Sequence, residues 1–127
     1  RDQSAPRLAA MLDSLGLEVD YVPANDPFFG RTGRIMATNQ REAALKFEIT
    51  TKVYGDDAGA TAIGSANYHN DHFGTAFDIR DAEGDVAHTS CLGLGMERTL
   101  IALFARHGMR TADWPSEVRA ILWQAND

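Results

Sequence analysis

The amino-acid sequence predicts an α+β protein in which helices pack against an antiparallel β-sheet. Several short stretches alternate apolar and polar residues, and the brief turn segments between them favour antiparallel pairing. Two longer stretches, one near each end of the chain, carry apolar residues at helical spacing. The 127 residues contain no internal repeat and no low-complexity tract, so we expect one domain over residues 1–127.

The N-terminal region is predicted to form a helix, a strand and a long loop. Apolar residues recur at helical spacing before Gly16, a glycine suited to ending a helix; they are Leu8, Met11, Leu12 and Leu15. Residues 17–22 alternate as a half-buried strand does. Residues 23–33 combine proline, glycine, asparagine and aspartate, which predicts a loop.

Four further strands and two helices are predicted after this loop. The strands cover residues 44–53, 60–68, 75–80 and 86–91, with turn residues between them. A helix over residues 96–107 is expected to end before Gly108, and a last helix to begin at Trp114-Pro115. The residues of the first of these helices that we expect to face the sheet are Ile101, Leu103 and Phe104.

The composition limits the class of protein and its partners. The chain has 44% hydrophobic residues and a formal net charge of −6, which disfavours wide non-specific contact with nucleic acid. One cysteine cannot form an internal disulfide, and no apolar run is long enough to cross a bilayer. These observations predict a cytoplasmic protein with no tRNA and no membrane partner. The chain begins at Arg1 rather than at methionine, which indicates the trailing part of a longer protein.

The stretch from His88 to Phe104 has the features of a nucleotide-binding site. Gly93 and Gly95 let the backbone approach a ligand closely, and the helix that follows offers free N–H groups at its start. Arg98, in the first turn of that helix, carries a planar cation suited to phosphate oxygens. Neither a P-loop nor a dinucleotide-binding fingerprint occurs in the sequence, so a different phosphate-binding architecture is required.

The order of strands, glycine turn and arginine-bearing helix resembles the second half of the catalytic domain of class II aminoacyl-tRNA synthetases. Residues 93–98 are similar to their motif 3, which would extend over residues 91–107. Within that class the nearest resemblance is to seryl-tRNA synthetase, carried by Lys46-Phe-Glu48-Ile, Ser65-Ala-Asn67, Val86-Ala-His88-Thr and Trp114-Pro115-Ser-Glu-Val118. The resemblance implies part of a class II catalytic domain, an antiparallel sheet flanked by helices.

Other segments resemble a truncated relative of that enzyme, the amino acid:carrier-protein ligases. They are Asn25-Asp-Pro-Phe-Phe-Gly-Arg31, Asn39-Gln-Arg-Glu42, Leu45-Lys-Phe-Glu48, Asn67-Tyr-His-Asn-Asp-His-Phe-Gly74 and His88-Thr-Ser-Cys91. This resemblance implies ATP-dependent activation of glycine or alanine to an aminoacyl-adenylate, and transfer to the phosphopantetheine thiol of a carrier protein. It implies Zn²⁺ and Mg²⁺ as cofactors, no tRNA-binding arm, and a homodimer for the full-length protein.

The resemblance assigns ATP binding to Arg98 and to a strand that lies along the nucleotide. Arg98 would hold the ATP phosphates; the alternative is a surface arginine that pairs with Glu97 or Asp81. The strand residues, which would let the backbone approach the nucleotide, are Ala62, Ile63, Gly64 and Ser65. Thr61 stands where seryl-tRNA synthetases carry an acidic magnesium ligand, so the sequence departs from that family's arrangement for Mg²⁺.

Cys91 resembles the last zinc-binding cysteine of the carrier-protein ligases, and the alternative is a small buried apolar residue. A catalytic zinc ion commonly takes three ligands from the protein. The resemblance places the partner cysteine and a glutamate upstream of this chain. Ligation by local histidines, among them His69, His72 and His88, is the other interpretation.

The residues implied for amino-acid binding are Glu48, Asn67 and Asp26. An unpaired carboxylate within an apolar strand is costly, so Glu48 needs a partner near the substrate ammonium or metal region, unless alternation points it outward. Asn67 either orients the substrate or caps a turn. Asp26 lies with Arg31 and Arg34 in a loop that would close over the adenylate or meet the carrier arm, or is a plain turn.

Two other functions stay open at this point. One is an atypical seryl-tRNA synthetase whose tRNA-binding coiled coil lies outside the chain. The other is a non-catalytic, synthetase-like binding module, which the absence of motifs 1 and 2 from these 127 residues favours, because the isolated chain is then expected to be inactive.

Overall fold

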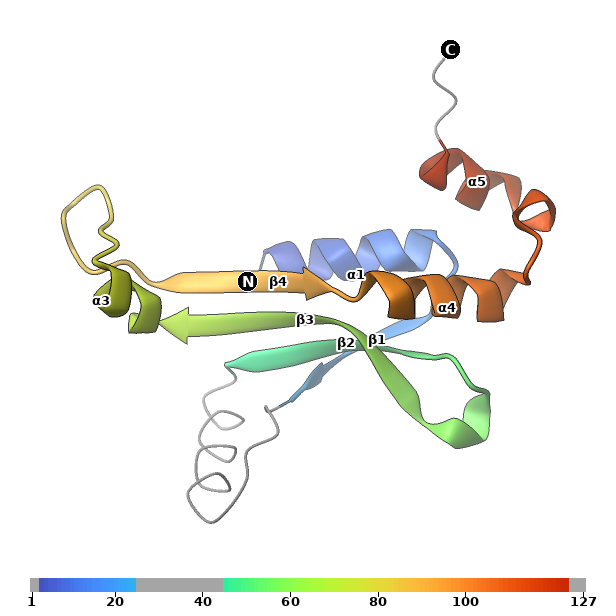
Figure 1. The fold of residues 1–127 in the computed structure, drawn as a ribbon, viewed down its shortest axis with the longest axis horizontal. Helices are drawn as coiled ribbons and strands as arrows, with labels where there is room; N and C mark the ends of the chain where they lie inside the picture. The colour runs from blue at the N-terminus through green and yellow to red at the C-terminus, as the bar shows by residue number, and fades with distance from the viewer. Residues whose placement is uncertain (1–2, 25–44, 124–127) are drawn as a thin grey trace.

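The computed structural model describes residues 3–24 and 45–123 (Figure 1). The elements in these ranges are α1 (Ser4–Ser14), β1 (Val19–Pro23), β2 (Lys46–Lys52), the 3₁₀ turn η1 (Asp56–Ala58), β3 (Ala60–Asn70), α3 (His72–Phe77), β4 (Thr89–Leu94), α4 (Met96–His107), the 3₁₀ turn η2 (Thr111–Asp113) and α5 (Ser116–Leu122). The predicted α+β class is confirmed. The predicted loop over residues 23–33 lies mostly outside the described residues.

The described strands form one antiparallel sheet in the order β1-β2-β3-β4, which confirms the predicted antiparallel pairing. Strand β3 is the longest strand and pairs with β2 on one side and β4 on the other. Its register shifts twice. Ile63 is the additional residue opposite β2, and His69 is the additional residue opposite β4. Each shift is a β-bulge, which changes the direction of the local backbone and side chains.

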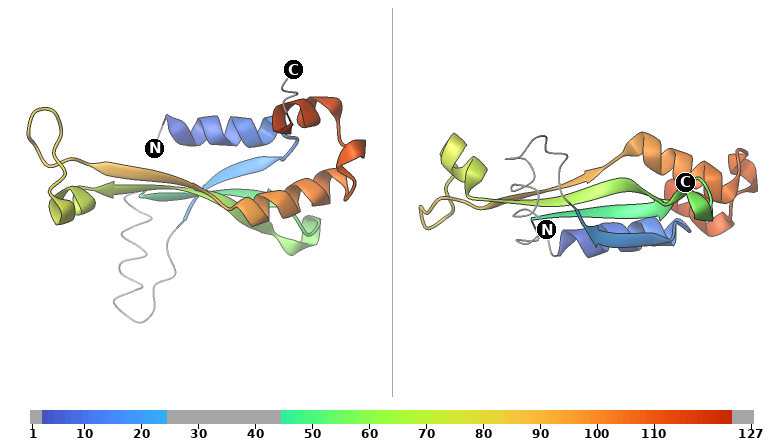
Figure 2. Two further views of the ribbon diagram at one scale, coloured as in Figure 1. Left: turned by 45° about the horizontal axis from the view of Figure 1, so that its top comes forward. Right: turned by 90° about the horizontal axis from the view of Figure 1, so that it is seen from below.

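Helix α1 covers one face of the sheet, and α5 lies on the same side (Figure 2). The apolar core lies on this side, because alternate strand residues point toward α1 and the inner side of α4. Its fully buried side chains with the largest volume are Leu12, Ile49, Ile63 and Val118. The prediction that Ile101 faces the sheet is wrong, since this side chain is 44% exposed, whereas Leu103 is buried and Phe104 is half-buried.

Helix α4 has the predicted limits, and both of its ends carry glycine. Gly95 is its N-cap, and Gly108 follows its last residue with a φ of 88°, a left-handed conformation that favours glycine. A ring nitrogen of His107, Nε2, lies 2.7 Å from the Leu15 carbonyl oxygen, which ties α4 to the end of α1. The Trp114 indole donates a hydrogen bond to the Gly108 carbonyl and thereby fixes the link to α5.

The predicted strand over residues 75–80 is wrong. Helix α3 occupies its first part, and only an isolated bridge, Arg80 to Val86, remains of the expected pairing. The residues alternate in polarity, but six residues are too few for this pattern to outweigh tertiary contacts. The packing of α3 against the segment before β4 requires glycine at position 74, because a Cβ there would lie 2.1 Å from the Ala87 carbonyl oxygen.

The predicted strand over residues 86–91 and the glycine turn after it also need correction. Strand β4 begins later, at Thr89, and continues through Gly93 to Leu94, so Gly93 belongs to a strand rather than to a turn. The close approach of β3 and β4 requires a small residue at the neighbouring Gly64 instead. A Cβ at Gly64 would lie 3.1 Å from the Gly93 carbonyl oxygen, whereas a Cβ at Gly93 would make only an ordinary contact.

The other predicted elements are shifted by a few residues from their observed limits. No helix within the described ranges is both long and apolar enough to cross a membrane.

Candidate nucleotide and substrate groove

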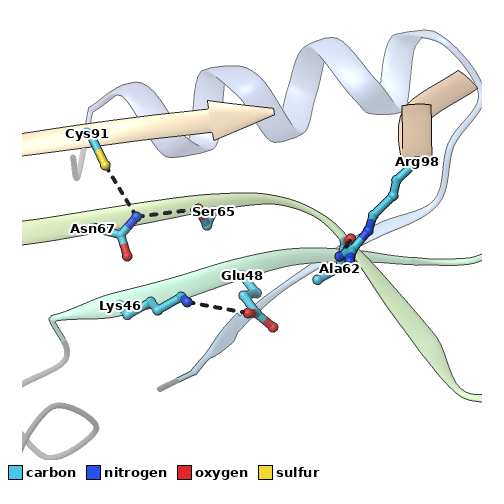
Figure 3. Close-up of polar contacts among 7 residues, drawn as sticks. All are labelled: Lys46, Glu48, Ala62, Ser65, Asn67, Cys91 and Arg98. Atoms are coloured by element: carbon cyan, nitrogen blue, oxygen red, sulfur yellow. Dashed lines mark hydrogen bonds and ion pairs between the residues drawn. The ribbon is translucent and has the colours of Figure 1, made fainter. Parts of the chain in front are cut away.

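The sheet face opposite α1 carries most of the predicted site residues. Because paired residues of antiparallel strands point to the same side, the register places Glu48 beside Ser65 and Lys46 beside Asn67. The pairing of β3 with β4 continues this row, since Asn67 faces Cys91 and Ser65 faces Gly93. Their neighbours Ile49 and Ala66 point the other way and are buried. Figure 3 draws the residues of this row that carry polar contacts, Lys46, Glu48, Ser65, Asn67 and Cys91.

Arg98 reaches this face from the first turn of α4 (Figure 3). Its guanidinium Nη1 donates a hydrogen bond of 2.9 Å to the carbonyl oxygen of Ala62. The backbone N–H of Gly95 donates to the carbonyl oxygen of Ile63, so β3 holds the start of α4 at two successive residues. No pairing of Arg98 with Glu97 or Asp81 is found in the described residues. The guanidinium is therefore held at the edge of the open face.

A groove of about 320 Å³ lies between the start of α4 and the three neighbouring strands. It is lined by Lys46, Glu48, Ala62, Ile63, Gly64, Ser65, Gly93, Leu94, Gly95 and Arg98. The five residues predicted to bind ATP thus line one groove together with Glu48. Ile63 contributes its backbone, because its side chain is buried in the core.

Glu48 has the partner that its place in an apolar strand requires. Its carboxylate oxygen Oε1 lies 3.8 Å from the Lys46 ammonium, and the two side chains are 32% and 13% exposed. The side chain does point outward, to the open face of the sheet, as the alternation predicts. Sequence reasoning did not identify Lys46 as a site residue. The position of Lys46 in the sequence could have identified it, because a residue two positions before Glu48 lies on the same face of the strand as Glu48.

Asn67 joins the middle of the groove to Cys91. Its side-chain amide donates to the Ser65 hydroxyl oxygen at 3.4 Å and to the Cys91 sulfur at 3.3 Å (Figure 3). Asn67 lies within β3, so the alternative that it caps a turn is wrong. Cys91 is exposed on the open face rather than buried in the core, which excludes its alternative as a small buried apolar residue.

The described residues offer no cluster of three or more histidine, cysteine, aspartate or glutamate side chains that would hold a metal ion. The histidines near Cys91 have other contacts. The His69 Nδ1 contacts the Thr89 hydroxyl, and the His88 Nδ1 contacts the Tyr68 phenol. Cys91 suits zinc chemically as one thiolate ligand, but the described part of the chain does not complete a zinc site.

The remaining predicted substrate residue, Asp26, lies outside the described residues, as do Arg31 and Arg34. A second cavity, of about 560 Å³, lies between the end of α1, the link from β2 to β3 and the end of α4. None of the predicted site residues lines it, and its charged residues are Glu18, Asp20, Lys52 and Arg106.

The fold of this chain has a match among solved protein structures. A crystal structure of M. kandleri SerRS in complex with A. aeolicus tRNASec has the same fold, with a TM-score of 0.68 and 25% sequence identity. The match covers 96% of this chain and 24% of the SerRS chain. The predicted likeness to a seryl-tRNA synthetase catalytic domain is confirmed.

Two kinds of curated protein are similar to the chain in sequence. Amino acid–acyl-carrier-protein ligase 2 of Bradyrhizobium diazoefficiens is 43% identical over 122 residues, covering 96% of this chain and 36% of the ligase. Type-2 serine–tRNA ligase of Methanopyrus kandleri is 28% identical over 125 residues, covering 93% of this chain and 24% of that enzyme. No protein-family model matches the chain. The chain is a homologue of part of an amino acid:carrier-protein ligase, and it spans about a third of the length of that relative.

Proposed function

We propose that the protein carrying this chain activates a small amino acid, glycine or alanine, with ATP and transfers it to the phosphopantetheine thiol of a carrier protein. The observation that carries the proposal is the groove, which brings Arg98 and the Ala62–Ser65 strand together. The likeness to an amino acid–acyl-carrier-protein ligase supports the reaction and the acceptor. The acidic composition, with a net charge of −6, supports an acceptor other than tRNA.

The reaction needs positioning and charge stabilisation more than a protein nucleophile. An oxygen of the amino-acid carboxylate attacks the α-phosphorus of ATP, the bond to the β-phosphate bridging oxygen breaks, and pyrophosphate leaves. The acceptor sulfur then attacks the carbonyl carbon of the adenylate. The thiol loses its proton, the bond from carbon to the phosphate oxygen breaks, and AMP leaves with the electron pair.

Each part of the groove has a role in this scheme. Arg98 provides a fixed cation and two or more donors for phosphate oxygens, and it would exchange its bond to the Ala62 carbonyl for the nucleotide. The carboxylate of Glu48 would accept a hydrogen bond from the amino group of the substrate, and the Lys46 ammonium beside it limits the negative charge of the groove. Asn67, between Ser65 and Cys91, would orient the amino acid.

The proposal includes the two implied cations. Cys91 would supply one zinc ligand, and zinc would bind the amine of the amino acid and so select small substrates. Magnesium would neutralise charge on the ATP phosphates. Because the described residues complete neither site, the roles above rest on Arg98, Glu48 and Asn67 alone.

The test is ATP–pyrophosphate exchange with glycine, alanine or serine, measured for the protein that carries this chain. Arg98→Ala is expected to lower the rate of exchange about 10- to 100-fold, the usual effect of removing a hydrogen bond to a charged group. Arg106→Ala is the matched control, because Arg106 lies on the same helix, forms an ion pair with Glu18 at 3.5 Å and does not line the groove. Equal rates in wild type and Arg98→Ala would contradict the role of the groove.

A serine–tRNA ligase is the second candidate, favoured by the fold shared with M. kandleri SerRS. Exchange that depends on serine, together with aminoacylation of tRNA and not of a carrier protein, would establish it instead.

A further inference from the structure

His69 is a feature of the open face that the proposed roles do not use. It is the additional residue at the second bulge of β3, between the pairs Tyr68–Ser90 and Asn70–Thr89. The next residue, Asn70, has a φ of 51°, a left-handed conformation that is unusual outside glycine. Bulges are frequent beside active sites because they redirect a side chain without ending the strand. The direction of the His69 side chain is therefore a local, specified feature.

Two contacts hold the imidazole of His69. Its Nδ1 lies 3.0 Å from the hydroxyl oxygen of Thr89 on β4. Its ring packs edge-on against Phe73 of α3, with ring centroids 4.7 Å apart. When Nδ1–H donates to the Thr89 hydroxyl, the Nε2 nitrogen carries the free lone pair. Within the described part of the chain, no hydrogen bond reaches Nε2.

The contact with Thr89 places the imidazole on the same face as the groove. Thr89, Cys91 and Gly93 alternate along β4, so their side-chain positions share one face of the sheet. Cys91 faces Asn67 across the strands, and Thr89 lies two residues further along. Two residues of a strand span about 7 Å. His69 is therefore the next polar group beyond Asn67 and Cys91, at the end of the open face away from Arg98.

We propose that His69 accepts the proton of the acceptor thiol in the transfer step. This inference rests on the proposed function and assigns a residue to its second step, the transfer to the thiol. The thiol S–H bond gives its proton to Nε2 as the sulfur attacks the adenylate carbonyl. The carbon–sulfur bond forms, the carbon–oxygen bond to AMP breaks, and the imidazolium keeps the proton until solvent removes it. A thiol is mostly protonated near neutral pH, so a proton acceptor beside it accelerates attack.

The neighbouring histidines do not have this arrangement. His88 uses Nδ1 for the Tyr68 phenol, and Tyr68 points to the opposite face from Asn67. His72 lies on α3, where it packs against Phe73 and is exposed. His72 is therefore a matched control, since it shares the aromatic neighbour of His69 without the bond to Thr89.

The experiment separates adenylation from transfer in the protein that carries this chain. Exchange of pyrophosphate reports adenylation, and formation of a thioester with small thiols reports transfer. His69→Asn retains an amide near the position of Nδ1, and His69→Gln retains one near Nε2, but neither accepts a proton. Both variants should keep exchange within about two-fold of wild type and lose about 100-fold or more in transfer to N-acetylcysteamine.

The dependence on the thiol distinguishes proton transfer from a structural role. Trifluoroethanethiol is acidic enough to react as a thiolate without help, so its transfer should fall less than about three-fold. Thr89→Val, which keeps the imidazole but removes the Nδ1 partner, should give an intermediate loss, and His72→Asn should leave transfer unchanged. Equal losses with both thiols, or a loss of exchange as large as that of transfer, would overturn the role of His69. A wild-type protein without exchange would contradict the proposed function itself, and this role with it.

Discussion

Each of the two bulges of β3 inserts one additional residue, but the two insertions have different structural consequences. At the first bulge the additional residue is Ile63, whose side chain is 1% exposed and lies in the core. Its carbonyl oxygen accepts the N–H of Gly95, and the neighbouring Ala62 carbonyl accepts the Arg98 guanidinium. At the second bulge the additional residue is His69, whose ring lies on the open face. The first bulge anchors α4, and the second presents a side chain.

This difference indicates a separation along β3, in which the first bulge contributes more to the stability of the fold than the second. At the Arg98 end of β3, core packing and backbone hydrogen bonds act together. The local structure there is therefore fixed by many groups. The His69 end depends on one hydrogen bond, one ring contact and a helix of six residues. Substitutions at the two ends should therefore affect different measurements.

The largest difference is expected between Ile63→Ala and His69→Ala. Removing the buried Ile63 side chain should lower the free energy of unfolding by about 2–5 kcal/mol, because a cavity remains in the core. Removing the half-buried His69 ring should cost about 1 kcal/mol, the typical net value of one hydrogen bond. Chemical denaturation of the two variants measures both values. Similar losses in the two variants would contradict the separation.

Gly74→Ala tests the end of the sheet that carries α3. A Cβ at Gly74 would lie 2.1 Å from the Ala87 carbonyl oxygen and 2.9 Å from Val86 Cγ1, so the backbone must move. Overpacking of this kind costs about 1–3 kcal/mol. The thermal midpoint should fall, and nucleotide binding at the other end should remain. A variant as stable as wild type would show that α3 is not fixed by this contact.

Gly93 tests the groove with a smaller expected effect on stability. A Cβ at Gly93 would lie 3.6 Å from the Ser65 hydroxyl oxygen, an ordinary contact, so Gly93→Ala should fold normally. Gly93→Val keeps strand propensity but adds methyl groups to the groove lining, and ATP affinity should fall about ten-fold. Calorimetric titration with ATP compares the two variants. Unchanged affinity in Gly93→Val would place the nucleotide elsewhere.

The long elements of the fold could be predicted from the sequence, because each has many residues that agree. Helix α4 has an apolar stripe and glycine at both ends, and β3 has eleven residues of strand pattern. Helix α3 could not be predicted, because the packing of Gly74 against Ala87 is a tertiary contact. Local sequence patterns carry no information about such a contact. A six-residue alternation gave the opposite prediction.

The candidate site was predicted mainly through resemblance. Motif similarity identified Arg98 and the strand from Ala62 to Ser65, and the structure brings them into one groove. Lys46 was missed because only its neighbour Glu48 was considered, although both share one strand face. The direction of His69 could not be predicted, because a bulge depends on the register between two strands, and register is not visible in the spacing of one strand.

The central claim is that ATP binds in the groove between the start of α4 and strand β3. Titration of the isotopically labelled protein with ATP, followed by backbone amide chemical shifts, tests it most directly. The account predicts that the largest shifts fall on residues 62–65 and 93–98. Shifts concentrated instead around the second cavity, at residues 16–20, Lys52 and Arg106, would contradict it.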